Sequence, residues 1–283
     1  MSGTELFHNI KQILLRNGII EGEACALAFI LIEEVCQLSR TQILTTDSIA
    51  TDTGKLTQMA QAIADGTPIQ QVLGYTYFCG HRLRITPAVL IPRPETEELV
   101  GCIAESSSSP CSILDIGTGS GCIAIALACL FPSAFVSAID ISDEALAVAQ
   151  ENADLNKVRV NFQNIDILTP QPAMQGAPFD VIVSNPPYIC HKEAAKMERN
   201  VLDHEPHLAL FVPDDDPLLF YRTIAHTSRH LLTAGGHLYF EINSQYADEI
   251  TFMLCSLGYA DISTRPDQFG KNRFIYAKTP SNL

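Results

Sequence analysis

The chain has 283 residues, of which 47% are hydrophobic and 18% charged, and its formal net charge is −14. This length is too great for one small core and predicts two domains, while the composition is ordinary for a globular protein. Non-specific nucleic-acid binding depends on Lys and Arg neutralising phosphates, so the acidic balance favours a small-molecule or protein partner over free DNA.

Residues 1–72 are predicted to be helical. Leu6, Ile10 and Leu14 recur at helical spacing ahead of Gly18, and two more such stretches precede the break at 65–68. No chemistry-bearing motif occurs here, so we expect a small all-α domain that recognises the substrate. Residues 73–92 place aromatic and aliphatic residues on both sides of a glycine, which predicts a β-hairpin linker.

Residues 93–283 are expected to form one α/β domain. A helix is predicted from Pro94 or Thr96, with Glu97 and Glu98 in its first turn. Strands are predicted at 112–116, 135–140, 158–162, 180–184, 237–242 and 273–278, and helices at 121–130, 143–156, 218–232 and 245–257. This alternation predicts a Rossmann-like domain with a mainly parallel sheet and helices on both faces.

A glycine loop, Asp-Ile-Gly-Thr-Gly-Ser-Gly at 115–121, joins the first of these strands to a helix. Glycines there let the backbone approach a ligand, and Asp140, which ends the next strand, can accept hydrogen bonds from both ribose hydroxyls. An adenosine cofactor is therefore predicted. Gly119-x-Gly121-x-x-Ala124 fits a relaxed dinucleotide fingerprint, whereas acidic-x-Gly-x-Gly-x-Gly is the form found in S-adenosyl-L-methionine-dependent methyltransferases.

The tetrapeptide Asn185-Pro186-Pro187-Tyr188 follows the strand predicted at 180–184. Its prolines stiffen the turn and push Asn185 toward extended geometry. The side-chain oxygen of Asn185 and the carbonyl of Pro186 can each accept one hydrogen from a substrate NH2, and Tyr188 can cover a planar amide or base. This turn suits methyl transfer and has no role in hydride transfer, so S-adenosyl-L-methionine is favoured over NAD. A non-catalytic adenosine-nucleotide-binding module is a further alternative.

Three motifs in this order resemble the HemK/PrmC family of protein-(glutamine-N5) methyltransferases: Ile-Pro-Arg-Pro-Glu-Thr-Glu at 91–97, the glycine loop, and the turn at 185–188. The resemblance implies an S-adenosyl-L-methionine-dependent enzyme that methylates the glutamine of the Gly-Gly-Gln loop in class I peptide chain release factors. Adenine methyltransferases of DNA or RNA share the turn, and a ribosomal protein is another possible glutamine acceptor. The acidic charge and the 91–97 motif favour the release factor and argue against a direct nucleic-acid substrate.

The resemblance also implies roles for individual residues. Catalytic roles are implied for Asn185, Pro186 and Tyr188, and substrate binding for these three with Pro187. Ile167 would flank the adenine, where some relatives carry a large aromatic residue. The implied cofactor contacts are Gly117, Thr118, Gly119, Ser120, Gly121, Asp140, Ile167 and Asn185.

The remaining features predict a cytoplasmic protein. The nine cysteines are odd in number and never form Cys-x-x-Cys, which favours reduced thiols. No stretch resembles a signal peptide, and the longest apolar run, 122–131, is too short to span a bilayer. His204 and His207 flank Glu205-Pro206, but a proline between them and the absence of Cys-x-x-Cys argue against zinc, so no metal is expected.

Overall fold

The computed structural model describes residues 1–106, 109–169 and 178–281. The chain divides into two compact units. One contains Met1–Tyr75 together with Glu198–His204, and the other contains Thr76–Met197 together with Glu205–Leu283. Within the described ranges, no helix combines the length and the apolar character that crossing a bilayer requires.

The first unit is built from helices around its own apolar core. Leu6, Ile10 and Leu14 lie on one face of the first helix and are buried, as their spacing predicts. Gln71 donates a hydrogen bond to the carbonyl of His204 (2.7 Å), which ties the second segment of this unit to the first. The helices are α1 (Gly3–Arg16), α2 (Glu21–Cys36), α3 (Arg40–Thr45), α4 (Thr53–Ala64), α5 (Ile69–Leu73) and α9 (Arg199–His204).

A two-stranded hairpin follows α5. Strands β1 (Tyr75–Phe78) and β2 (His81–Arg84) pair within the range in which a hairpin is predicted. The chain reverses at Cys79 and Gly80, which both adopt positive φ angles, 48° and 77°. At Gly80 the absence of a Cβ removes the cost of a positive φ, while Cys79 adopts the left-handed region with its side chain in place.

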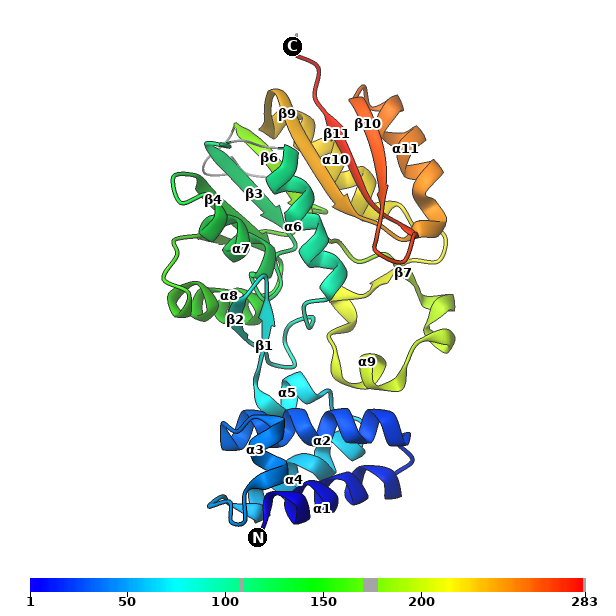
Figure 1. Cartoon of the computed structure of the whole chain (residues 1–283). Helices are drawn as coiled ribbons and strands as arrows, with labels where there is room; N and C mark the ends of the chain where they lie inside the picture. Colours follow the sequence, from blue (N-terminus) through cyan, green and yellow to red (C-terminus); the bar gives the residue numbers. More distant parts are fainter. Residues whose placement is uncertain (107–108, 170–177, 282–283) are drawn as a thin grey trace. The chain divides into compact units, whose positions relative to one another are not determined.

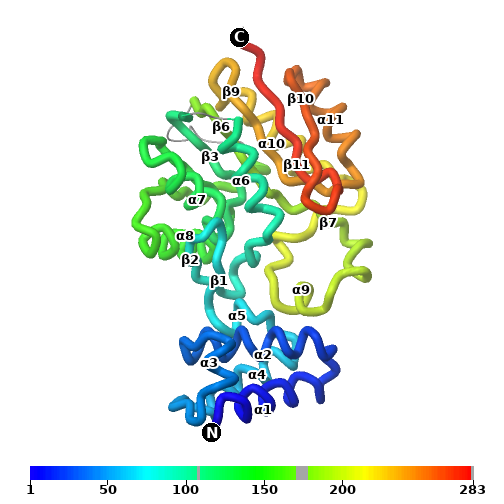
Figure 2. The backbone as a smooth tube through the Cα atoms, in the orientation of Figure 1, coloured from blue at the N-terminus to red at the C-terminus, as the bar shows by residue number. Residues whose placement is uncertain are grey.

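The second unit contains a seven-stranded sheet with the order β10-β11-β9-β6-β3-β4-β5. Figure 1 shows its labelled strands from β4 to β10 side by side, and Figure 2 traces the same path of the backbone. The pairs among β9, β6, β3, β4 and β5 are parallel, and β11 is antiparallel to both of its neighbours. The predicted α/β class with a mainly parallel, Rossmann-like sheet is thus confirmed. The strands are β3 (Ser112–Ile116), β4 (Phe135–Asp140), β5 (Asn161–Asn164), β6 (Phe179–Ser184), β9 (Leu232–Glu241), β10 (Ala260–Pro266) and β11 (Asn272–Lys278).

Alternate residues of the central strands enter two different cores. Ile113 and Val181 pack in the cluster that includes α6 (Pro94–Ser106) and α7 (Cys122–Leu130). Leu114 and Ile182 pack in the cluster on the other face. Successive side chains of a strand point to opposite faces, so a sheet covered on both sides needs apolar residues throughout. The helices of the second cluster are α10 (Leu219–Leu231) and α11 (Ala247–Ser256), and α8 (Asp143–Leu155) packs beside β4 and β5.

Three features of the sheet differ from the sequence-based expectation. Strand β9 was expected at 237–242 but begins at Leu232, where its pairing with Phe179 of β6 starts. The third strand is displaced from 158–162 to Asn161–Asn164, because its pairing with β4 begins only at Ser137↔Asn161. Strand β10 was not predicted. It is an edge strand with mostly exposed or half-buried residues, so it lacks the apolar run that marks a buried strand.

The order of the strands creates a crevice between β3 and β6. The chain runs from β3 to β4 and β5 on one side, and then to β6 and β9 on the other side. Ligands bind beyond the carboxyl ends of the strands at such a switch point. The ends of the two strands are also fixed to each other, because Ile116 pairs with Ser184 and the buried Ser184 hydroxyl donates to the Ile116 carbonyl (2.7 Å). The loops that follow these strands therefore lie side by side.

Candidate active site

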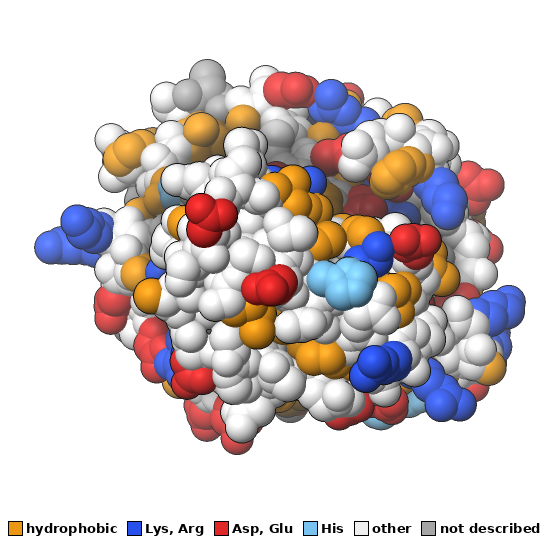
Figure 3. Space-filling view, turned by 60° about the horizontal axis from the view of Figure 1, so that its bottom comes forward, with side chains coloured by type: hydrophobic (Ala, Val, Ile, Leu, Met, Phe, Trp, Pro, Cys, Tyr) orange, Lys and Arg blue, Asp and Glu red, His pale blue; other side chains and the backbone are white. Residues whose placement is uncertain are grey.

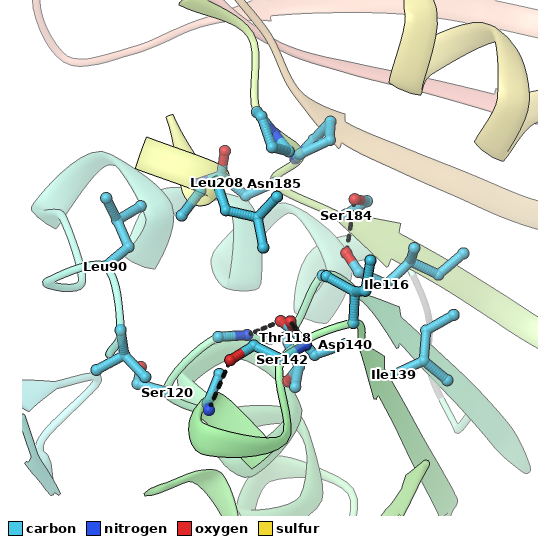
Figure 4. Close-up of a pocket in the computed structure, with 18 of the residues that line it drawn as sticks. Leu90, Ile116, Thr118, Ser120, Ile139, Asp140, Ser142, Ser184, Asn185 and Leu208 are labelled. Carbon is cyan, nitrogen blue, oxygen red and sulfur yellow. Dashed lines mark hydrogen bonds between the residues drawn. The ribbon is translucent and has the colours of Figure 1, made fainter. Parts of the chain in front are cut away.

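A cavity of about 220 Å³ lies beyond the carboxyl ends of these strands. Figure 4 shows Asn185 and Leu208 on one side of it and Thr118, Asp140 and Ser142 on the opposite side. The glycine loop after β3 and the turn after β6 both contribute to the lining. The topology thus brings together two motifs that are far apart in the sequence.

The three glycines of the loop have two different roles. All three adopt positive φ angles, 73° at Gly117, 54° at Gly119 and 82° at Gly121. A Cβ added at Gly117 or Gly119 would meet no protein atom within 4 Å, so these two positions leave open space beside the backbone. At Gly121 a Cβ would lie 3.1 Å from Ala149, and this glycine does not line the cavity. Gly121 therefore permits close packing of the loop on α8, while the other two permit approach of a ligand.

Asp115 stabilises the conformation of the glycine loop. Its Oδ2 accepts hydrogen bonds from the Thr118 hydroxyl (2.6 Å) and from the backbone N–H of Ala124 (3.2 Å). The side chain is fully buried, and this burial raises the pKa of Asp115 to about 7. Asp115 is not among the described residues that line the cavity, so it shapes the loop instead of contacting a ligand.

Asp140 lines the cavity at the end of β4. Its Oδ2 accepts from the N–H of Gly119 (2.8 Å) and its Oδ1 from the N–H of Ser142 (3.0 Å). Each carboxylate oxygen can accept more than one hydrogen bond, so both can still accept from a pair of neighbouring hydroxyls. The two backbone donors hold the carboxylate in the orientation that such a contact needs.

Apolar side chains form the wall next to Asp140. Ile167, which is predicted to flank an adenine, lines the cavity and is 9% exposed. Ile141 and Leu168 line it as well and are exposed by 45% and 43%, which is unusual for large aliphatic residues. These two were not predicted, although each directly follows a predicted site residue. The wall suits a flat apolar ring that covers these side chains.

The turn after β6 supplies polar acceptors to the cavity. Asn185, Pro186 and Pro187 line it. The Asn185 Nδ2 lies 3.4 Å from the Thr96 hydroxyl oxygen and donates to it, so its Oδ1 is the end of the amide that stays available as an acceptor. Thr96 in turn donates to Glu241, neither of which was predicted as a site residue.

Tyr188 is placed differently from the other residues of this turn. It packs against the core that contains α10 and α11, and it is not one of the described cavity-lining residues. Its hydroxyl donates to Oε1 of Glu241 (3.3 Å), and burial raises the pKa of this phenol. The geometry therefore shows Tyr188 behind the turn, whereas the sequence led us to expect it over a substrate.

Glu205 holds the 91–97 stretch to the loop that carries Leu208. It accepts from the N–H of Ile91 (3.1 Å) and pairs with the Arg93 guanidinium (2.5 Å), and its side chain is 1% exposed. Leu208 lines the cavity and is 59% exposed, so an apolar side chain is presented at its edge. Its position could not be read from local patterning, because the loop that carries it is joined at Glu205 to residues more than 100 positions earlier. No cluster of three or more potential metal ligands is found among the described residues.

Comparisons with known proteins match this chain to methyltransferases. A family profile described as "Methyltransferase domain" matches residues 107–251. A release factor glutamine methyltransferase of Bacteroides thetaiotaomicron is 50% identical over 74% of this chain and 75% of its own length. A protein of the same name from Flavobacterium psychrophilum is 43% identical over 90% of this chain and 92% of its own.

A solved structure shows the same fold. The crystal structure of a methyltransferase from Pyrococcus furiosus superposes with a TM-score of 0.52 and 18% identity, covering 71% of this chain and 90% of that one. The identities to the two bacterial proteins, and the share of each chain that is aligned, establish the family as well as the fold. The chain belongs to the release factor glutamine methyltransferase family.

Proposed function

We propose that this chain transfers a methyl group from S-adenosyl-L-methionine to the side-chain amide nitrogen of a glutamine in the Gly-Gly-Gln loop of class I peptide chain release factors. The observation that carries this proposal is the position of Asn185, which lines the same cavity as the glycine loop and whose Oδ1 is available as an acceptor, in a chain that matches a methyltransferase profile. The names of the relatives support the acceptor.

The residues of the cavity fit this cofactor. Asp140 would accept from the two ribose hydroxyls, and Ile141, Ile167 and Leu168 would pack around the adenine. The open space at Gly117 and Gly119 lets the backbone approach the cofactor closely. S-adenosyl-L-methionine supplies a methyl group on a positively charged sulfur, which is already a good electrophile.

The chemical task of the protein is to orient a poor nucleophile. The lone pair of an amide nitrogen is delocalised into its carbonyl, so the nitrogen must be held with its remaining electron density toward the methyl group. Asn185 Oδ1 and the Pro186 carbonyl would each accept one hydrogen of the NH2 group and fix its direction. Position and preorganised dipoles then account for most of the rate. As the N–CH3 bond forms, the S–CH3 bond breaks and S-adenosylhomocysteine leaves. No base is needed before attack, because the N–H becomes acidic once the nitrogen is alkylated and its proton then passes to solvent.

The same geometry constrains the acceptor. A glutamine side chain has a planar NH2 that suits two acceptors, and flanking glycines let its backbone come close without a clash. A lysine ammonium has no free lone pair. Asparagine is one methylene shorter and would leave its nitrogen out of line, where small displacements cost large factors in rate.

A nucleic-acid base is the main alternative acceptor, since its exocyclic NH2 is also flat. Double-stranded nucleic acid needs a basic surface. On the face shown in Figure 3, acidic and basic side chains are interspersed, and the described residues displayed there form no broad basic area. Together with the net charge of −14, this favours a protein acceptor.

Labelled methyl transfer to a panel of release factors, ribosomal proteins, DNA and RNA tests the proposal. We expect the label on a class I release factor, and mass spectrometry should place a single methyl on its loop glutamine. The matched control is the same factor with that glutamine replaced by glutamate, which should take no label. Methylation that survives this replacement, or that appears only on nucleic acid or a ribosomal protein, would reject the proposed acceptor.

We further propose that the helical unit recognises the protein substrate. It has its own core, shows no catalytic motif, and exposes two large aliphatic side chains, Ile20 (72%) and Leu44 (50%). Apolar side chains on a surface are common sites of protein contact when they are part of a larger interface.

A chain that starts at Gly74 should keep its cofactor affinity but methylate a whole release factor roughly 10-fold more slowly or worse, as expected when contacts remote from the chemistry are lost. A short peptide carrying the Gly-Gly-Gln sequence should be methylated at similar rates by both forms, which controls for damage to the site. Circular dichroism should show a folded truncated chain. Equal rates of the two forms on the whole release factor would contradict the proposed role.

A further inference from the structure

A chain of hydrogen bonds lies behind Asn185. The Asn185 Nδ2 donates to Thr96 Oγ1 (3.4 Å), and the Thr96 hydroxyl donates to Oε2 of Glu241 (2.7 Å). Both Thr96 and Glu241 are 2% exposed. A buried polar group of this kind is retained in a fold only where its hydrogen bonds are satisfied.

The sheet explains why these groups meet. Ser184 of β6 pairs with Phe240 of β9 in parallel register, so the next residues of the two strands, Asn185 and Glu241, emerge at the same edge. Thr96 lies in the first turn of α6, within the 91–97 stretch. Part of that stretch thus contacts the turn after β6, although 89 positions separate Thr96 from Asn185.

The groups around Glu241 include hydrogen-bond donors and a guanidinium, which favour a carboxylate that accepts hydrogen bonds. Burial raises the pKa of Glu241, and the nearby Glu95 raises it further, whereas the Thr96 hydroxyl, the Arg273 guanidinium and the Tyr188 hydroxyl lower it. Its two oxygens receive one hydroxyl each, Oε2 from Thr96 and Oε1 from Tyr188. In this arrangement both carboxylate oxygens act as acceptors.

The donor and acceptor inventory then fixes the Asn185 amide. A threonine hydroxyl has one hydrogen, and Thr96 gives it to Glu241. Only lone pairs remain on Thr96 Oγ1, so the end of the amide that faces it must be the NH2 group. The two ends of an amide are alike in shape and are distinguished by such a network. If the amide were reversed, its NH2 would meet the NH2 of the acceptor glutamine, and two donors cannot bind each other.

We propose that Thr96 and Glu241 are positioning residues that fix which end of the Asn185 amide faces the acceptor. This inference rests on the proposed function, in which Asn185 Oδ1 accepts from the substrate NH2. Glu241 acts through the single hydrogen of Thr96 and touches neither reactant. The same carboxylate also accepts from Tyr188, so it holds both ends of the turn at 185–188.

Two substitutions test the direction in which the hydrogen bonds of this chain are donated. Thr96→Val keeps the shape of the side chain and removes the hydroxyl. Glu241→Gln is isosteric, but its NH2 can donate to Thr96, which frees the Thr96 hydrogen for Asn185 Oδ1 and favours the reversed amide. In both variants we expect kcat to fall roughly 5- to 30-fold, as when a neutral hydrogen bond that orients a reacting group is lost. The dissociation constant of S-adenosylhomocysteine should stay within twofold of the wild-type value.

Two controls separate positioning from general damage. Thr96→Ser retains the hydroxyl and should restore most of kcat. Thr223→Val makes the same exchange on α10, where the hydroxyl donates to the Leu219 carbonyl of its own helix and Thr223 is not among the described cavity-lining residues, so it should leave kcat unchanged.

A spectroscopic measurement tests the network independently of activity. The side-chain NH2 signal of Asn185 in a ¹⁵N-labelled protein, assigned by its loss in Asn185→Asp, should shift in Thr96→Val and Glu241→Gln but not in Thr223→Val. A wild-type kcat in Thr96→Val, or an Asn185 signal that does not move in it, would overturn the proposed positioning. If the wild-type protein transfers no methyl group to a release factor, the proposed function fails, but the signal still decides whether Thr96 and Glu241 hold the amide.

Discussion

Replacing Asn185 by alanine is expected to lower the turnover number roughly 100-fold or more, the usual loss when a preorganised polar group at a reacting centre is removed. The variant should fold and keep much of its cofactor affinity. Asn185 lies at the end of β6, is only half-buried, and leaves the buried apolar residues of the strand in place. What it would lose is one of the two acceptors that orient the substrate NH2.

Single-turnover rates and calorimetry of S-adenosylhomocysteine binding measure the two effects separately. Asn272→Ala is the matched control, because Asn272 is exposed at the start of β11 and does not line the cavity. A near-normal single-turnover rate in Asn185→Ala would show that the turn has a structural role only. A loss of cofactor binding equal to the loss of rate would also contradict the assignment, since it would place Asn185 on the wrong reactant.

Replacing Gly119 by alanine should reduce cofactor affinity roughly 10- to 100-fold, the range expected when an extra methyl group is forced into a filled site. The added Cβ meets no protein atom within 4 Å, so the methyl group would project into space that we assign to the cofactor. The positive φ of 54° also costs about 1 kcal/mol of stability for a residue with a Cβ.

Gly270→Ala separates these two effects. Gly270 has a φ of 79° and likewise no atom within 4 Å of an added Cβ, but it does not line the cavity. Both variants should lose a similar amount of thermal stability, and only Gly119→Ala should lose affinity for S-adenosylhomocysteine. Unchanged affinity in Gly119→Ala, or an equal loss in both variants, would mean that the loop does not approach the cofactor as proposed.

The central strands were predictable from sequence because both of their faces are buried. Strands β3 and β4 match the predicted ranges 112–116 and 135–140, where apolar residues continue without alternation. The edge strand β10 escaped prediction since its residues are largely exposed. The start of β5 was misplaced because Val158 and Val160 pack against the core without joining the ladder.

Some residues of the candidate site could likewise be predicted from the sequence, and others could not. Asp140 and Asn185 could be predicted, because residues directly after parallel strands gather at one edge of the sheet. Glu241 also follows this rule as the last residue of β9, but its relation to Asn185 depends on the strand order, which local patterning does not contain. Thr96 reaches the site through a long-range contact to Glu241, and Leu208 lies three residues after Glu205, which is bound by Ile91 and Arg93. Tyr188 was expected over the substrate, yet its ring packs against the core, where contact with apolar side chains stabilises an aromatic ring.

The bond from the Ser184 hydroxyl to the Ile116 carbonyl has a consequence for the choice of acceptor. It joins the starts of the two loops on adjacent strands. In the proposed function, the distance between the methyl donor and the acceptor amide is therefore set by the sheet. Because this distance is fixed, an acceptor side chain that is one bond too short or too long places its nitrogen out of line with the methyl group. New acceptors can then arise from changes in the turn and its neighbouring loops, while the alignment of the transferred methyl group is inherited unchanged.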